Sequence, residues 1–299
     1  MASTSRANFA QRDGIDLYYE LAGNPAGPPM LLIPGLGMQM IDWPDHFIEP
    51  LAAQFQLILM DNRDRGLSTT LHGAPSDAGA LLEAMLSGQE PDIAYLLSDM
   101  GDDAAAVLES VGADQAHVVG ISMGGMIAQT LTLQHPERVA SLASIMSTTG
   151  APDVGQPTPE ALTAIMSAPP ENTREAMIAA GVENIRVWAS PDHYDPEEMA
   201  VSLAASWDRV GGAQAEGTAR QTCAIVASPA RDEALASVQA PTVVIHGTAD
   251  KLVTPSGGER TAACIPGAEL LLIDGMGHDV PKALVDHVVG GVTRNAASA

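Results

Sequence analysis

The stretch that most constrains the fold of this chain is residues 117–129, His-Val-Val-Gly-Ile-Ser-Met-Gly-Gly-Met-Ile-Ala-Gln. Its first three residues predict a buried strand, and apolar residues at helical spacing after Ser122 predict a helix. Between them lies Gly-x-Ser-x-Gly, the pattern of a sharp strand-to-helix turn. Such a turn forces its corner residue into positive-φ backbone, which only well-determined surroundings tolerate. Gly120 and Gly124 carry no Cβ atom, so the strand and the helix can pass close together.

Ser122 is therefore expected at the carboxyl edge of a sheet and at a helix N-terminus, where the helix dipole and free N–H groups favour negative charge. Small-residue turns of this composition also occur by chance, so a catalytic role needs partners elsewhere in the chain. A serine nucleophile requires a histidine base that a carboxylate orients, and this kind of turn has the chain order Ser, Asp or Glu, His.

Two later strands end in residues of the required types. The strand predicted over 242–246 precedes Asp250, and the strand predicted over 269–273 precedes His278. Loops at the carboxyl ends of neighbouring parallel strands meet at one edge of a sheet. We therefore predict that Asp250 and His278 join Ser122 as catalytic residues.

Other residues compete for these roles less well. Asp274 and Asp279 are alternative acids, but they lie too near His278 in sequence to reach the far side of its ring easily. Cys223 and Cys264 match no metal-ligand spacing and occupy no recognisable catalytic turn, so both are expected to be buried thiols.

An oxyanion hole is expected from two backbone N–H groups, one after the nucleophile and one in the loop after an early strand. The first belongs to Met123. The second falls in the loop after the apolar run 30–33, where Pro34 has no N–H to give, and Leu36 is preferred over Gly35 or Gly37.

A substrate pocket is expected beside this hole. Its predicted lining is Gly35, Gly37, Trp188, Trp207 and Met276. Each tryptophan is more often a core residue than a substrate contact, so both interpretations stay open.

The order of elements predicts the architecture. A hairpin over 8–22, with its turn at Asp13-Gly14, precedes strands that alternate with helices, which favours an α/β fold with a mostly parallel, eight-stranded sheet and helices on both faces. Residues 147–238 carry prolines between short helical patterns and no good strand. We expect them to form a helical cap of four or five helices, inserted into a core domain of residues 1–146 and 239–299.

Four helices and two loops are further predictions. The helices are expected over 42–54 with Asp42 as possible N-cap, 93–112 with Gly112 as C-cap, 256–264, and 281–293. Residues 71–92 are long for a plain connection and resemble a lid or binding loop. The charged turn Asp61–Ser68 could bind an anion, but we favour an Asp–Arg network, satisfied within the turn, that shapes a loop.

The net charge is −23, from 37 acidic and 14 basic residues. This balance repels nucleic acid and anionic membranes, and it suggests tolerance of high salt, because ions screen the self-repulsion. Residues 116–134 are weakly charged but fit a buried strand–turn–helix, so no membrane insertion is expected. Met1–Arg12 lacks the apolar core of an export signal, so a cytoplasmic monomer or homodimer is expected, without cofactor or metal.

With these motifs placed, the chain resembles the α/β-hydrolase superfamily along nearly its whole length, and within it the capped esterases related to aclacinomycin methylesterase. The segments that carry the resemblance are 61–68, Gly120-Ile-Ser-Met-Gly-Gly125, His246-Gly-Thr-Ala-Asp250 and Gly275-Met-Gly-His-Asp279. The resemblance implies a cofactor-free Ser-His-Asp hydrolase with a helical cap. One departure is Pro34-Gly35 where many members have His-Gly.

These patterns predict a carboxylesterase that acts on small or medium esters through an acyl-enzyme. One alternative is a lactonase, such as an enol-lactone hydrolase, which would need a cation for the carboxylate of its substrate. The cap arginines available for that role are Arg174, Arg186, Arg209 and Arg220. An alternative of another class is a ligand-binding sensor without turnover.

Overall fold

The computed structural model describes residues 8–167 and 171–299. Its centre is one eight-stranded sheet with the strand order β1-β2-β4-β3-β5-β6-β7-β8. Strand β2 is antiparallel to both of its neighbours, and all later pairs are parallel. The strands are β1 (Asn8–Arg12), β2 (Ile15–Gly23), β3 (Pro29–Ile33), β4 (Gln56–Met60), β5 (Ala116–Ile121), β6 (Val139–Ile145), β7 (Thr242–Gly247) and β8 (Glu269–Ile273). The predicted mostly parallel sheet is confirmed.

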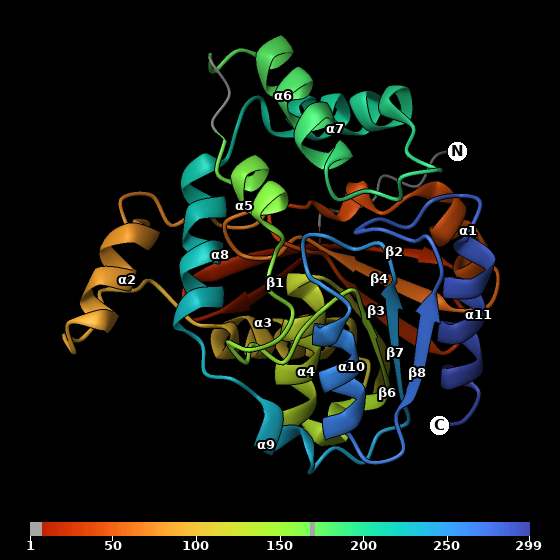
Figure 1. Cartoon of the computed structure of the whole chain (residues 1–299). Coiled ribbons are helices and arrows are strands. Elements are labelled where there is room, and N and C mark those ends of the chain that lie inside the picture. Colours follow the sequence, from red (N-terminus) through yellow and green to blue (C-terminus); the bar gives the residue numbers. More distant parts are fainter. Residues whose placement is uncertain (1–7, 168–170) are drawn as a thin grey trace.

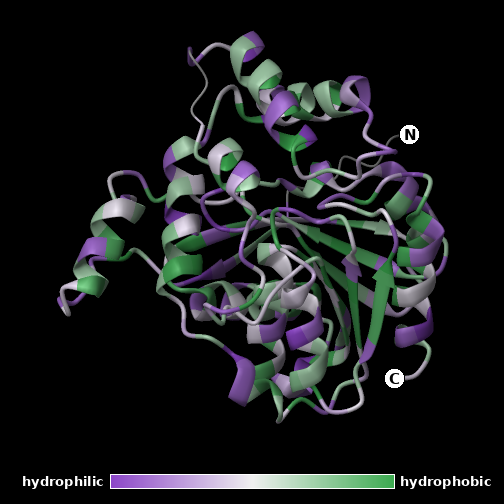
Figure 2. Cartoon of the chain, viewed as in Figure 1, coloured by the Kyte–Doolittle hydropathy of each residue, from purple (hydrophilic) through white to green (hydrophobic). Residues whose placement is uncertain are grey.

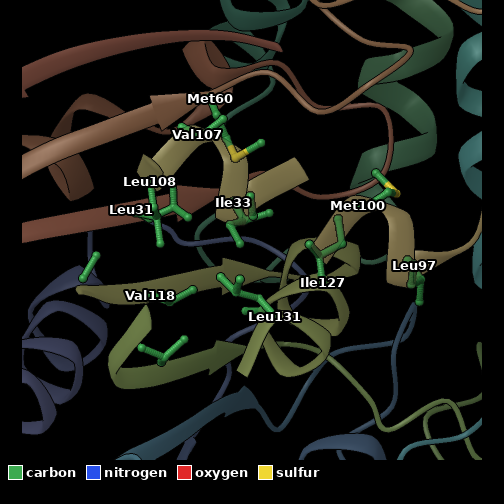
Figure 3. Packing of buried hydrophobic residues seen from close by; sticks show 14 of the residues in the cluster. Leu31, Ile33, Met60, Leu97, Met100, Val107, Leu108, Val118, Ile127 and Leu131 are labelled. Carbon is green, nitrogen blue, oxygen red and sulfur yellow. The ribbon is translucent and has the colours of Figure 1, made fainter. Parts of the chain in front are cut away.

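The inner strands are apolar along their length because both faces of the sheet are covered. Alternate residues face opposite sides, so Leu31 and Ile33 belong to one buried cluster, whereas Met30 and Leu32 belong to the other. Figure 2 shows these strands as the most hydrophobic part of the molecule. Figure 3 shows the first cluster, in which Leu131 of a covering helix packs toward the strands.

Helices cover both faces of the sheet, as predicted. α3 (Leu97–Val111) and α4 (Met123–Gln134) supply residues to the first cluster, and the end of α10 (Ser256–Cys264) packs on the same side. α1 (Asp45–Ala52) and α11 (Val285–Ala296) supply residues to the second cluster. The sheet edge at the carboxyl ends of the parallel strands is thereby left for loops.

The segment between β6 and β7, which we call the cap, is helical, and its described residues contain no strand. Its helices are α5 (Pro159–Ile165), α6 (Arg174–Arg186), α7 (Pro196–Val210), α8 (Ala215–Ala227) and α9 (Asp232–Leu235). Figure 1 shows α6 and α7 beyond the end of the sheet toward which the arrows of β7 and β8 point. The short α9 packs on α10 and α4 instead. The division into two domains at 146/147 and 238/239 stays a prediction.

The helix predicted over 42–54 begins later than expected. Asp42 ends a 3₁₀ turn, η1 (Met40–Asp42), and its carboxylate accepts the N–H of Gln39 (2.7 Å) rather than capping α1. Pro44 then occupies the N-cap of α1. The prediction was wrong because the carboxylate of Asp42 accepts the N–H of a preceding residue, Gln39, and not an N–H group of α1.

Other boundaries also shift. The helix predicted over 281–293 begins only at Val285, after a turn in which the N–H of Leu284 donates to the carbonyl of Pro281. α3 begins at Leu97 and ends, as predicted, at Gly112, whose φ of 76° is left-handed.

The segment predicted as a long loop over 71–92 contains a helix, α2 (Ala78–Leu86). The carboxylate of Asp77 caps it by accepting the N–H groups of Gly79 and Ala80. α2 packs against α8 of the cap (Figure 1).

Two negative findings concern the described residues. None of their helices is long and apolar enough to cross a bilayer. They also hold no group of three or more His, Cys, Asp or Glu side chains arranged for a metal ion. Residues 1–7, part of the stretch in which we expect no export signal, lie outside the described residues. Cys223 is buried, as predicted, whereas Cys264 is only half-buried, and both thiols are free.

Candidate active site

Ser122 forms the corner between β5 and α4, with φ 56° and ψ −121°. Its N–H donates to the carbonyl of Ile145 at the end of β6 (2.9 Å), which fixes the corner to the neighbouring strand. A Cβ atom on Gly120 would lie 2.1 Å from the carbonyl oxygen of Gly124, and one on Gly124 would lie 2.0 Å from that of Ile33. Both glycines are therefore required by close backbone approach, as the sequence predicts.

The three residues predicted to be catalytic form one hydrogen-bonded chain. Nε2 of His278, in the loop after β8, lies 2.9 Å from Oγ of Ser122. Nδ1 of the same ring lies 2.7 Å from Oδ2 of Asp250, in the loop after β7. With Asp250 ionised, Nδ1 carries the proton and Nε2 is free to accept one from the serine hydroxyl.

Asp250 is almost completely buried, yet its carboxylate is well satisfied. Oδ1 accepts the N–H groups of Leu252 (2.9 Å) and Val253 (3.0 Å). Nε2 of the buried His246 lies 3.3 Å from Oδ2. Burial alone would raise the pKa of Asp250, but the interactions with His278 and His246 outweigh burial and lower this pKa to about 2.

His246 is a further partner of Asp250, and the sequence analysis did not predict it. The sequence feature that could have indicated this contact is the position of His246 near the end of β7, four residues before Asp250. Its Nε2 also lies 2.8 Å from the carbonyl of Val253, so the ring holds the turn that contains the acid.

The two predicted oxyanion donors are free in the described structure. The N–H groups of Leu36 and Met123 donate to no described residue. The N–H of Gly37, by contrast, donates to Oε1 of Gln221 on α8 (3.0 Å), which removes it as an alternative. Gly35 stays open as the alternative to Leu36, since a Cβ on it would lie 3.3 Å from Cβ of Ser122.

Two buried amides hold the loop in which Pro34 replaces the usual histidine. Nδ2 of Asn62 donates to the carbonyl of Pro34 (2.9 Å). Gln221 accepts from Gly37, as described, while its Nε2 donates to the carbonyl of Arg63 (2.9 Å). The oxyanion loop is thus fixed from the turn after β4 and from the cap, by contacts that span 28 and 184 positions.

The charged turn 61–68 does form an Asp–Arg network, but it is not satisfied within the turn. Asp64 is paired with Arg220 of α8 by two hydrogen bonds (2.9 and 2.8 Å). Asp61 is paired with Arg209 of α7 (2.7 Å), and Arg63 with Asp103 of α3. The expectation of a self-satisfied turn was wrong because its partners come from the cap and from α3.

The predicted pocket residues fall into three groups. Gly35 lies against Ser122, and Gly37 against Thr218 of the cap. The carbonyl of Trp188 accepts the N–H of His278 (2.7 Å), whereas no interaction described for Trp207 reaches the catalytic residues. Met276 has no exposed surface and packs in the second core cluster, so its side chain belongs to the core rather than to an open pocket wall.

The competing acids are engaged elsewhere. Asp274 accepts a hydrogen bond from the hydroxyl of Thr248 (3.1 Å). Asp279 accepts two from Ser190 of the cap. Neither carboxylate contacts the ring of His278 in the described structure.

The model of one protein family, described as the alpha/beta hydrolase fold, matches residues 28–281. The chain belongs to the α/β-hydrolase family. This assignment agrees with the strand order of the sheet and with the position of Ser122 between β5 and α4.

Among proteins of known role, this α/β hydrolase is similar to two rhodomycin D methylesterases. DauP of Streptomyces sp. strain C5 is 27% identical over 318 aligned positions, which cover 96% of this chain and 97% of DauP. DnrP of Streptomyces peucetius is 27% identical over 315 positions, with coverage of 96% and 97%. Among solved structures, Est816, an N-acyl homoserine lactone degrading enzyme, is 28% identical with a TM-score of 0.67 and coverage of 97% and 98%.

Proposed function

We propose that this α/β hydrolase cleaves carboxylic esters through a covalent acyl-enzyme on Ser122. The observation that carries the proposal is the hydrogen-bonded chain from Ser122 through His278 to Asp250. In the proposed first step, Oγ of Ser122 attacks the ester carbonyl while Nε2 of His278 takes the hydroxyl proton. Asp250 holds the imidazole in the required tautomer and stabilises the imidazolium that forms.

The N–H groups of Leu36 and Met123 are the proposed donors to the oxyanion that develops on the carbonyl oxygen. Loss of one such donor typically costs a factor of about 10²–10³ in kcat. His278 then protonates the leaving alcohol, and a water molecule attacks the acyl-enzyme with His278 as base. The second half-reaction releases the carboxylic acid and regenerates Ser122.

We propose neutral esters of small to medium size, methyl esters included, as the substrate class. The similarity to DauP and DnrP, both rhodomycin D methylesterases, supports ester hydrolysis. The charges of the cap support a neutral substrate, because each cap arginine considered as a carboxylate anchor already faces a carboxylate. The pairs are Arg174–Asp208, Arg186–Glu183, Arg209–Asp61 and Arg220–Asp64.

A neutral lactone is the second candidate, and the similarity to Est816 favours it. A lactone is a cyclic ester, so the same three residues would open it. An enol-lactone that carries a carboxylate is less favoured, because Arg209 and Arg220 are committed to Asp61 and Asp64.

The test is hydrolysis of p-nitrophenyl esters from acetate to laurate, in parallel with N-acyl homoserine lactones of matched acyl length. Ser122→Ala should abolish turnover, whereas Ser87→Ala, which alters an exposed serine on the surface, should leave it unchanged. Labelling of the wild-type protein by a fluorophosphonate, absent in Ser122→Ala, would identify the nucleophile directly. Ligand binding without turnover of any ester or lactone would instead support a sensor, and turnover that survives in Ser122→Ala would refute the mechanism.

A further inference from the structure

The loop between α6 and α7 of the cap crosses the loop that carries His278. A Cβ atom on Gly277 would lie 2.3 Å from the carbonyl carbon of Ala189 and 2.5 Å from the nitrogen of Ser190. Only glycine permits this approach of two backbones. At the crossing, the N–H of His278 donates to the carbonyl of Trp188 (2.7 Å).

Ser190 joins the residues on either side of His278. Its Oγ accepts the N–H of Gly277 (2.8 Å) and donates its own proton to Oδ1 of Asp279 (2.5 Å). The N–H of Ser190 donates to the same carboxylate oxygen (2.9 Å). Ser190 has no exposed surface, so water does not compete for these hydrogen bonds.

We propose that Ser190 and Asp279 are positioning residues for the histidine base. They fix the N–H of Gly277 and the carboxylate of Asp279, on either side of His278, against the cap and thereby hold Nε2 at hydrogen-bond distance from Oγ of Ser122. The inference rests on the proposed function, since it assigns how the base of that reaction is held. A displacement of about 1 Å at such a group lowers the rate about 10²-fold.

Residues 188–190 of the cap thereby help to position the base rather than only covering the site. Four hydrogen bonds, those of Gly277, His278 and Asp279 with Trp188 and Ser190, would have to break before this loop of the cap could move away. On this proposal, His278 is held in place only while residues 188–190 are seated on its loop.

The experiment compares Ser190→Ala, Asp279→Ala and Asp279→Asn. The first two remove the link and should lower kcat about 10–100-fold with little change in KM, because the base is displaced while the substrate site is untouched. Asp279→Asn keeps an oxygen that can accept both hydrogen bonds of Ser190, so it should retain most of the wild-type kcat. The Ser190→Ala/Asp279→Ala double variant should be no slower than the slower single variant, because both remove one network.

The matched control is Tyr194→Phe. Tyr194 lies four residues after Ser190 in the same loop. Its hydroxyl donates within the cap, to the carbonyl of Val182 (2.6 Å). Loss of this bond removes a similar interaction without touching the histidine loop, so kcat should stay unchanged. If Ser190→Ala does not fold, the contrast between Asp279→Ala and Asp279→Asn still tests the proposal.

A second readout is independent of turnover. The hydrogen-bonded Nδ1 proton of His278 should give a downfield resonance in the NMR spectrum, assigned by its loss in His278→Ala. This resonance should move or broaden in Ser190→Ala and Asp279→Ala. If the wild type hydrolyses no ester but the resonance responds, the positioning role stands and the proposed function fails. If the wild type is active and both variants keep its kcat and its resonance, the positioning role is overturned.

Discussion

Replacement of Arg220 by methionine should destabilise the protein strongly, because this arginine forms a fully buried ion pair. Arg220 and Asp64 have almost no exposed surface, and two guanidinium N–H groups reach the carboxylate at 2.9 and 2.8 Å. Methionine keeps the apolar stem. Among the described residues, Asp64 would then keep only the hydroxyl of Tyr95 (2.8 Å) and the N–H of Leu71 (2.8 Å) as donors.

The expected loss follows from the burial of the remaining charge. Removal of one partner of a buried pair costs about 3–5 kcal/mol, a large part of a typical free energy of unfolding. At about 2 °C per kcal/mol for a chain of this size, Tm should fall by about 6–10 °C. Calorimetry and urea unfolding would measure both quantities. The double variant Arg220→Met/Asp64→Asn should recover part of the loss, since asparagine tolerates the positive φ of 67° at residue 64.

The chain offers a matched control in Arg174→Met. Arg174 contacts Asp208 through the same two-bond geometry (2.7 and 2.7 Å), but both side chains are exposed. An exposed pair contributes about 0–1 kcal/mol, so Tm should change little. If Arg220→Met lowers Tm no more than Arg174→Met does, burial of the charge is not the cause and the reasoning fails.

Four further predictions concern catalysis and salt. Asp250→Asn should lower kcat about 10³–10⁴-fold through the wrong imidazole tautomer. Because the pKa of Asp250 is lowered to about 2, protonation of this carboxylate should not lower the wild-type kcat until the pH falls to about 3; a loss of activity from Asp250 protonation near its ordinary pKa of about 4 would contradict this. Gln221→Leu frees the N–H of Gly37 and should lower kcat about tenfold with KM unchanged, by loosening the oxyanion loop; a rise in KM alone in steady-state kinetics would argue against it. The net charge of −23 predicts that Tm rises between 0.1 and 1 M NaCl, as the Debye length falls from about 10 to about 3 Å; a steady fall in Tm would exclude salt tolerance.

The sequence predicts well those parts of the molecule that local chemistry determines. The strands around Leu31 and Val118 are apolar runs, as expected for a parallel sheet that is covered on both faces. Gly120 and Gly124 flank Ser122 because larger residues would overlap the backbone. Both features occupy a few consecutive residues, even though the close contact of Gly124 is with the distant Ile33, so a sequence pattern reveals them.

The parts that escape prediction depend on contacts between distant segments. Gln221 lies 184 positions from Gly37 and in no motif, whereas Asn62 lies within the motif 61–68, which does not reveal its contact with Pro34, 28 positions away. Arg220 pairs with Asp64 across 156 positions, so the charged turn gave no sign of its partner. The start of α1 is missed for a local reason, since the carboxylate of Asp42 binds the N–H of Gln39 in the preceding turn.

The crossing of the histidine loop by residues 188–190 limits how new substrate specificities can be built on this scaffold. A cap taken from a related hydrolase would bring its own segment in place of Ser190, and Gly277 and Asp279 would then face a surface that does not match them. The exchangeable unit is therefore not the cap alone. A chimera should transfer the α6–α7 loop together with residues 277–279, and α8 together with the loop around Gly37. Both partners of each hydrogen bond would then come from the same protein.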